Sequence, residues 1–240
     1  MFDYFESQYD IIGHLRPLFA RGVAYVRDGK VHIKGNDSWD VPWIYITPDG
    51  EAEEHTRKAV CFMCQEIKFK YWHFIPVRCH NCWKVVVRPR TLKELFDLHE
   101  LQKELNLWSK AGIEDRPRTP HIYGGYFYNK TLKEARKCRA MVQEAVSSKI
   151  NPDIPINIKR GCTEFEEKFQ ESKQWTIAPG VQEFEDYLDE RIVLDIEKSP
   201  QPDFVILNVK RKWVERACEV GHDYLDFAGG RSISTLVTTY

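Results

Sequence analysis

The chain has 240 residues, of which 42% are hydrophobic and 30% are charged, and its net charge is −1. These values are ordinary for a globular protein. No stretch approaches the roughly 18 apolar residues of a membrane helix, and the acidic, aromatic start of the chain differs from the basic and then apolar start of a secretory signal. We therefore expect a soluble protein that stays in a reducing intracellular compartment and is neither secreted nor embedded in a membrane.

The first part of the chain is predicted to form antiparallel strands. Residues 23–26 and 31–34 flank Asp28-Gly29, a pair that supplies the positive φ angles of a type I′ turn, and so indicate a β-hairpin. A further strand is predicted over 43–47, where it is closed by Pro48-Asp-Gly.

Four cysteines follow, arranged as two C-x₂-C pairs with 14 residues between the pairs. The two-residue spacing aims both sulfurs of a pair at one ion, and the second pair completes the tetrahedron that Zn²⁺ accepts. Four thiolates leave no open position for water, so the expected zinc ion is structural and not catalytic. A disulfide pair or four buried thiols are the alternatives. The predicted ligands are Cys61, Cys64, Cys79 and Cys82.

Strands are expected on both sides of each cysteine pair, over 59–62, 67–74, 75–78 and 83–88. With the doubled C-x₂-C spacing, the segment 57–90 resembles the zinc-ribbon class of four-cysteine modules. Zinc ribbons occur in nucleic-acid-binding proteins, in polymerase-associated factors and as stabilisers inside larger folds. The resemblance therefore implies one structural zinc ion and narrows the function only to these classes.

The remainder of the chain is predicted to be mainly helical. Thr91-Leu-Lys-Glu94 is a capping box that begins a helix to about Trp108, and the segment 111–120, with a glycine and two prolines, is a possible linker. We expect an α+β fold with a β-rich region over 1–110 that includes the ribbon, and a mainly helical region over 121–240. Strands are also predicted over 121–128 and 156–160. Further helices are predicted over 131–149, beginning with a capping box at Thr131, after a third capping box at Thr163, over 181–197 and over 203–220.

The predicted ribbon is basic and rich in aromatic residues. Between residues 57 and 90, eight Lys or Arg accompany Glu66 alone. Basic side chains neutralise phosphates and exposed rings stack on bases, so this composition favours contact with nucleic acid or with a complex that acts on it. Alternatively, the rings pack internally while the cations face water or attract the acidic region 163–203. The candidate contacts are Lys68, Lys70, Tyr71, Trp72, Arg78, Lys84, Arg88 and Arg90.

Fragments of catalytic motifs are also present. His73 followed by Cys79-His-Asn-Cys82 resembles HNH nucleases, although that family carries a longer insert between the histidine and the second knuckle. Asp195 and Glu197 resemble the first carboxylate motif of proofreading exonucleases, where two acids share a divalent ion. A nuclease site needs several such groups together. We expect His73, Asp195 and Glu197 to be ordinary packing or surface residues.

Cys162 lies between a glycine and the start of a predicted helix, a setting that can lower the pKa of a thiol. No base is evident for a nucleophile there, and a buried core cysteine is the alternative. Our leading hypothesis favours a binding protein over an enzyme: a zinc-stabilised protein whose basic aromatic ribbon contacts nucleic acid or a complex that processes it. A metal-dependent nuclease and a structural or assembly subunit remain the alternatives.

Overall fold

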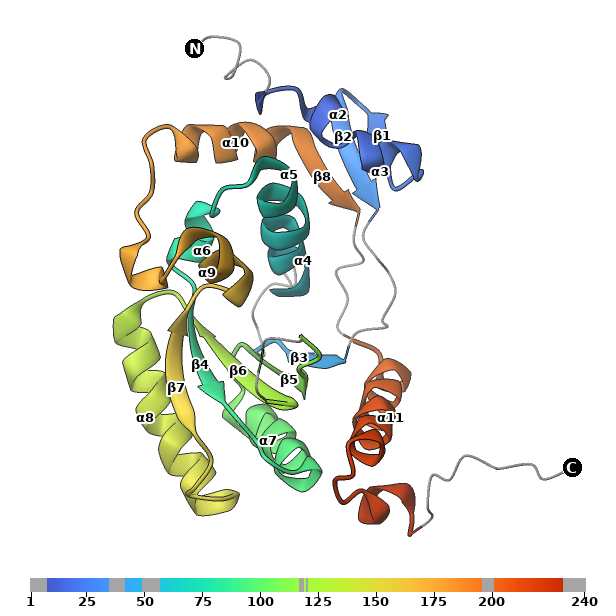
Figure 1. Cartoon of the computed structure of the whole chain (residues 1–240), viewed down its shortest axis with the longest axis vertical. Coiled ribbons are helices and arrows are strands. Elements are labelled where there is room, and N and C mark those ends of the chain that lie inside the picture. Colours follow the sequence, from blue (N-terminus) through green and yellow to red (C-terminus); the bar gives the residue numbers. More distant parts are fainter. Residues whose placement is uncertain are drawn as a thin grey trace, which may run out of the picture. The chain divides into compact units, whose positions relative to one another are not determined.

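The computed structural model describes residues 8–34, 42–48, 57–116, 119, 121–195 and 201–230. The fold is mixed α and β, with helices and two separate sheets (Figure 1). None of the helices in these ranges is long and apolar enough to cross a membrane. The chain forms two compact units that alternate along the sequence: unit 1 is Met1–Ser38, Ala52–Trp83 and Arg160–Ser199, and unit 2 is Trp39–Glu51, Lys84–Lys159 and Pro200–Tyr240.

Unit 1 contains a three-stranded sheet in the order β1 (Ala24–Arg27), β2 (Lys30–Lys34) and β8 (Ile192–Asp195). Strands β1 and β2 pair antiparallel across Asp28 and Gly29, which have φ angles of 51° and 74°, so the predicted hairpin is confirmed. Strand β8 pairs parallel with β2. The prediction of a helix over 181–197 is therefore only partly right, because the helix ends at Arg191 and the β-branched residues after it enter the sheet.

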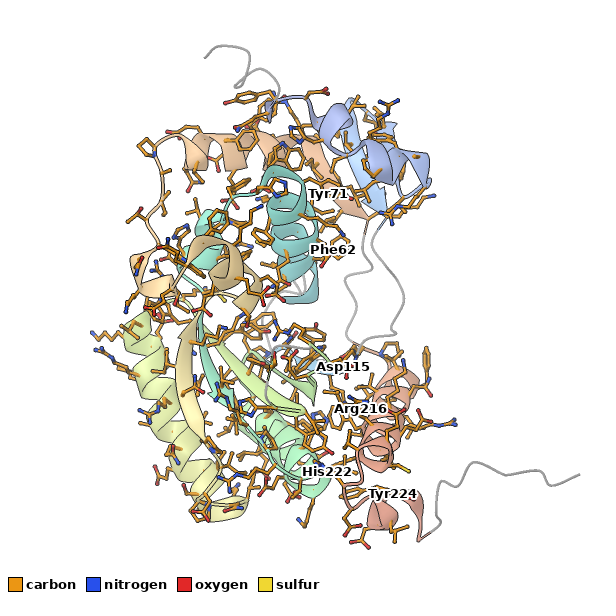
Figure 2. All side chains as sticks on the ribbon, viewed as in Figure 1. Phe62, Tyr71, Asp115, Arg216, His222 and Tyr224 are labelled. Atoms are coloured by element: carbon orange, nitrogen blue, oxygen red, sulfur yellow. The ribbon has the colours of Figure 1, made fainter. Side chains whose placement is uncertain are left out.

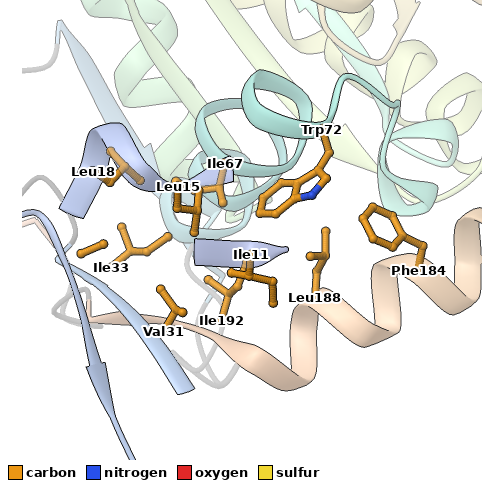
Figure 3. Packing of buried hydrophobic residues seen from close by; sticks show 11 residues of the cluster. Ile11, Leu15, Leu18, Val31, Ile33, Ile67, Trp72, Phe184, Leu188 and Ile192 are labelled. Atoms are coloured by element: carbon orange, nitrogen blue, oxygen red, sulfur yellow. The ribbon is translucent and has the colours of Figure 1, made fainter. Parts of the chain in front are cut away.

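Several helices of unit 1 enclose one of its apolar core clusters together with this sheet. Figure 3 shows its side chains converging from helices, strands and a π-helical segment. Leu15, Ile33 and Leu188 are fully buried, and each such side chain stabilises the fold by about 1.5–3 kcal/mol. The helical elements are α2 (Ile11–His14), α3 (Arg16–Ala20), α4 (Arg57–Phe62), the π-helix η2 (Met63–Phe69), α5 (Lys70–Trp72), α6 (Val77–His80), α9 (Thr163–Phe169), the 3₁₀ turn η3 (Ser172–Gln174) and α10 (Val181–Arg191).

The strands predicted over 59–62 and 67–74 are wrong, because α4, η2 and α5 form one helical run there. None of 75–78 is a strand either, since residues 75 and 76 are irregular and α6 begins at Val77. The buried residues explain the difference: Cys64, Ile67, Lys68 and Trp72 recur at intervals of three, one and four residues, as on one helix face. Only the strand after the second cysteine pair is confirmed, as β4 (Trp83–Val87). The structure therefore shows a mixed α and β fold and no β-ribbon around the first cysteine pair.

Unit 2 is built on a five-stranded sheet in the order β3-β5-β6-β4-β7. The chain order β4-α7-β5-β6-α8-β7 is the β-α-β-β-α-β arrangement of ferredoxin-like folds, with β3 added at one edge. Residues 111–113, at the start of the possible linker, lie within β5. The elements besides β4 are β3 (Trp43–Ile46), β5 (Ser109–Ile113), β6 (Tyr123–Asn129), β7 (Ile156–Arg160), α7 (Leu92–Leu105), α8 (Leu132–Lys149), α11 (Asp203–Glu219) and the 3₁₀ turn η4 (Leu225–Ala228).

The three long helices of unit 2 pack on one face of this sheet. Val85, Val87 and Phe127 share one core cluster with residues of α7 and α8, and Ile44 and Ala111 share another with α7 and α11. The approach of α7 is close, because a Cβ added to the glycine at position 125 would stand 2.4 Å from the Leu98 side chain. Asp115, two residues after β5, forms an ion pair with Arg216 of α11, with 3.8 Å between Oδ1 and Nε, and both residues are labelled in Figure 2.

The threonine caps predicted for α7 and α8 are confirmed, and in both helices the glutamate of the predicted capping box accepts from the residue before the threonine and not from the threonine itself. Thr91 Oγ1 accepts a hydrogen bond from the Glu94 backbone N–H at 3.1 Å, while the Glu94 carboxylate accepts from the Arg90 N–H at 2.7 Å. Thr131 and Glu134 repeat this pattern in α8. Both helices therefore begin where the sequence predicts.

Candidate metal centre and basic surface

Five of the seven cysteines lie in unit 1, and none of the seven forms a disulfide bond. Cys61 is in α4 and Cys64 one turn later in η2, so the first pair is carried by the helical run instead of by a β-knuckle. Cys79 is in α6 and Cys82 immediately precedes β4. The fifth, Cys162, is the residue before α9 and takes the N-cap position that the sequence assigns to Thr163.

The thiols of Cys64 and Cys79 are hydrogen-bonded to each other across the two segments. This hydrogen bond is the main reason why the pKa of Cys64 is lowered, although burial opposes the shift and the nearby Lys68 charge supports it. The same bond, together with burial, raises the pKa of Cys79 well above its usual range. The structure thus joins the first and second cysteine pairs through one sulfur of each.

The surroundings of these thiols are apolar. Cys64 and Cys79 belong to a core cluster with Ile75, Phe165 and Trp175, and Phe165 is fully buried. Phe69 packs edge-on against Phe165, with 4.8 Å between ring centroids. Sulfur ligands in a dry setting suit Zn²⁺, which binds thiolates strongly. Within the described ranges, however, no three His, Cys, Asp or Glu side chains already stand in an arrangement that could hold a metal ion.

No family model, no curated protein and no solved structure matches this chain.

The eight residues expected to contact nucleic acid divide between the two units and between surface and interior. Lys68 is only 2% exposed, and its Nζ lies 2.7 Å from carboxylate oxygens of both Glu185 and Asp189. Lys84 is buried with its Nζ 5.8 Å from the centre of the Tyr128 ring. These two cations are therefore part of the interior, not of a binding surface.

Trp72 is likewise a core residue, and its indole N–H donates to the Gln8 carbonyl at 2.9 Å. Of the remaining candidates, Tyr71 and Arg88 are half-buried. Lys70, Arg78 and Arg90 are exposed. Arg90 is held in unit 2 by a hydrogen bond from its guanidinium to the Asp153 carbonyl, whereas Lys70 pairs with Glu66.

Helix α8 carries a basic surface that the sequence analysis missed. Its buried residues form one stripe against the sheet: Ala135, Cys138, Val142 and Val146. Opposite this stripe, three exposed cations recur at positions i, i+3 and i+4, and no carboxylate in the described part of the chain pairs with them. We call this set the α8 basic face: Lys133, Arg136 and Lys137.

Other cations of unit 2 differ from the α8 basic face because they have hydrogen-bond or ion-pair partners. Arg139 of the same helix is also exposed, but its guanidinium Nε donates to the Ile156 carbonyl oxygen of β7 at 3.3 Å, so it lies toward the sheet and is not part of the set. Two lysines of α7, by contrast, are paired with carboxylates of their own helix. The helical spacing of the three cations was the sequence signal that could have found this face.

Among the residues that resemble nuclease motifs, His73 and Asp195 are described by the structure, and they lie in different surroundings. Asp195 accepts a hydrogen bond from the Tyr25 hydroxyl at 2.5 Å and lies 3.0 Å from His32 Nδ1. These contacts, with the Tyr25 bond the larger, lower the pKa of Asp195. Asp195 therefore has a structural role in unit 1 and is not a simple surface acid. His73 is exposed and ends α5 with a φ of 58°, and Glu197 lies outside the described residues.

Proposed function

We propose that this protein is a zinc-stabilised nucleic-acid-binding protein, in which the α8 basic face contacts phosphates and a structural zinc ion orders unit 1. The observation that carries the proposal is the α8 basic face itself, a set of three exposed cations on one side of a well-capped helix, with which no carboxylate of the described residues pairs.

Phosphate binding is the chemistry that such a face supports best. Each Lys or Arg that neutralises a phosphate releases a condensed counterion, which gives sequence-independent affinity. The rigid helix holds all three cations on one side, so a nucleic-acid backbone can contact several of them together. Additional contacts are proposed for four cations of the original candidate set: the exposed Lys70, Arg78 and Arg90 and the half-buried Arg88. The aromatic candidate Tyr71 is also half-buried.

The zinc part of the proposal depends on the thiols of unit 1. Their doubled C-x₂-C spacing and apolar surroundings fit a structural ion, and the hydrogen bond between Cys64 and Cys79 brings one sulfur of each pair together. When bound, a zinc ion supplies cross-linking between these segments, so its binding free energy becomes folding free energy. With sulfur at all four positions, no coordination site is open for catalysis.

Elemental analysis tests the zinc. Protein purified without chelator should contain about one zinc per chain, and its removal should lower the melting temperature of the full-length protein. Zinc-free protein that is as stable as the zinc-supplemented protein would refute this part of the proposal.

Fluorescence anisotropy with a labelled single-stranded oligonucleotide tests the α8 basic face. Replacement of all three cations by Gln should weaken binding and reduce the slope of log K against log salt by about 2–3, because each lost phosphate contact contributes roughly 0.7–0.9. A matched control replaces two lysines and one arginine of unit 2 that are exposed but paired with carboxylates: Lys93, Lys103 and Arg211.

Equal losses in the two variants, or no binding to single-stranded or structured nucleic acid at low salt, would contradict the proposal. In that event we would propose a protein and not a nucleic acid as the binding partner. The exposed Phe204 and Leu207 of α11 are then the first residues to replace in a test for protein binding. Divalent-metal-dependent cleavage of the oligonucleotide, abolished by Asp195→Asn, would instead favour a nuclease.

A further inference from the structure

The chain between β7 and α9 is fastened to the second cysteine pair. The Gly161 backbone N–H donates to the Cys82 carbonyl oxygen at 2.7 Å. One residue earlier, the Arg160 guanidinium Nε donates to the His80 carbonyl oxygen, also at 2.7 Å. These two hydrogen bonds fix the backbone that leads into Cys162 against the segment that carries Cys79 and Cys82.

The turn at Gly161 permits a particularly close approach. Its φ is +62°, a conformation that L side chains rarely adopt. An added Cβ would lie 2.5 Å from the Trp175 ring and 3.6 Å from the Cys79 carbonyl oxygen. Glycine is thus required both for the backbone conformation and for the space, and the result is that residue 162 follows directly beside the second cysteine pair.

The Cys162 side chain shares its interior with two predicted ligands. Cys64, Cys79 and Cys162 are all buried in one apolar cluster, whereas Cys61 and Cys82 are half-buried and are not among the residues of that cluster. Cys82 and Cys162 are also near enough to Cys79 to contribute, after the Cys64 hydrogen bond and burial, to the raised pKa of Cys79. Cys64, Cys79, Cys82 and Cys162 therefore lie in one region of unit 1 and come from three separate segments of it, although no three of these described residues already stand in an arrangement that could hold a metal ion.

We propose that Cys162 is a zinc ligand and that the site consists of Cys64, Cys79, Cys82 and Cys162, with Cys61 outside the first coordination shell. This inference rests on the zinc site proposed above and changes its composition. Tetrahedral zinc needs four ligands and unit 1 supplies five thiols. The three most buried of them already share a core, and the fourth, Cys82, is hydrogen-bonded through its carbonyl to the residue before Cys162.

Cobalt substitution in the full-length protein tests this assignment. The sulfur-to-cobalt charge-transfer absorption of a Co²⁺-loaded site increases with the number of bound thiolates. Cys162→Ser should therefore reduce that absorption by about a quarter or abolish metal binding, because one of four thiolates is lost. Cys61→Ser should retain the absorption of the wild type. Cys218→Ser, a change in unit 2, is the control for the loss of a thiol elsewhere.

A second measurement uses the unaltered protein, so that poor folding of a variant does not decide the outcome. In zinc-loaded protein, alkylation followed by mass spectrometry should modify Cys61 but not Cys162, and Cys162 should become reactive when a chelator removes the zinc. Undiminished cobalt absorption in Cys162→Ser, or protection of Cys61 with modification of Cys162 in the zinc-loaded protein, would overturn the inference. A wild-type protein that binds no zinc would refute the metal proposal itself and is distinguished by elemental analysis alone.

Discussion

Replacement of the buried Lys68 by Met provides a stringent test of the interior of unit 1. The Lys68 ammonium group contacts Glu185 and Asp189, and the second oxygen of Glu185 accepts the Val77 backbone N–H at 2.6 Å. Met retains most of the apolar volume but leaves the buried Glu185 carboxylate without its cation. Breaking a buried pair in this way costs about 3–5 kcal/mol of unfolding free energy.

Lys70 supplies a matched control, because it is two residues away and pairs at 3.4 Å with Glu66 on the exposed side of the same helical run. Lys70→Met should cost less than about 1 kcal/mol. Urea unfolding measures both variants. With an m value of roughly 1–3 kcal/mol/M, Lys68→Met should lower the midpoint by about 1 M or more. Hydrogen exchange should show faster exchange in peptides of unit 1.

Addition of Glu185→Gln to the Lys68→Met variant should recover part of the lost stability, because the double change no longer leaves an uncompensated buried carboxylate. If Lys68→Met is no more destabilising than Lys70→Met, the buried ion pairs are not formed in solution. Lys68 would then return to the set of cations available for phosphate binding.

Three further predictions concern other positions. Burial lowers the pKa of His99 to about 4 from an unfolded value of 6.5. Because the unfolded chain binds the proton more tightly, this group should remove about 2 kcal/mol of unfolding free energy between pH 7 and pH 5, and His99→Gln should remove that part of the pH dependence in urea unfolding. Gly161→Ala should destabilise the protein by about 1–3 kcal/mol more than Gly180→Ala, since both have positive φ but only the former meets other atoms; equal costs would refute the close approach. Tyr25→Phe should raise the pKa of Asp195 toward its usual range in an NMR titration, because the Tyr25 hydrogen bond is the main cause of its lowering.

Local signals in the sequence predicted a large part of the fold. The hairpin at Asp28-Gly29 and the threonine caps at Thr91 and Thr131 each depend on interactions within a few residues, and each is present. The segment before Trp72 was predicted wrongly because its aromatic and β-branched residues have high strand propensity. Its helical spacing becomes clear only when Lys68 is counted among the buried residues, and that lysine is buried by carboxylates of a distant helix.

In the candidate site, too, the sequence predicted the local features and not those that depend on long-range packing. The spacing of Cys61 to Cys82 is a local pattern, whereas the position of Cys162 depends on a hydrogen bond between Gly161 and Cys82 that sequence spacing does not encode. Strand β8 is another long-range feature, since parallel pairing with β2 unites the two ends of unit 1. Proximity of this kind arises from tertiary packing, which single-sequence patterns do not contain.

The alternation of the two units also affects the order in which a newly made chain can fold. Domains generally fold as the chain emerges from its N-terminus, but the sheet of unit 1 requires Val31 to pair with Ile192. The segment Lys84–Lys159, which contains most of the β-α-β-β-α-β arrangement of unit 2, is contiguous and is completed earlier. During synthesis, the segment with Cys61 to Cys82 is therefore made well before the segment 160–199 that completes unit 1. In that interval the contiguous part of unit 2 is already able to fold. A disulfide formed prematurely in that interval would trap the incomplete unit.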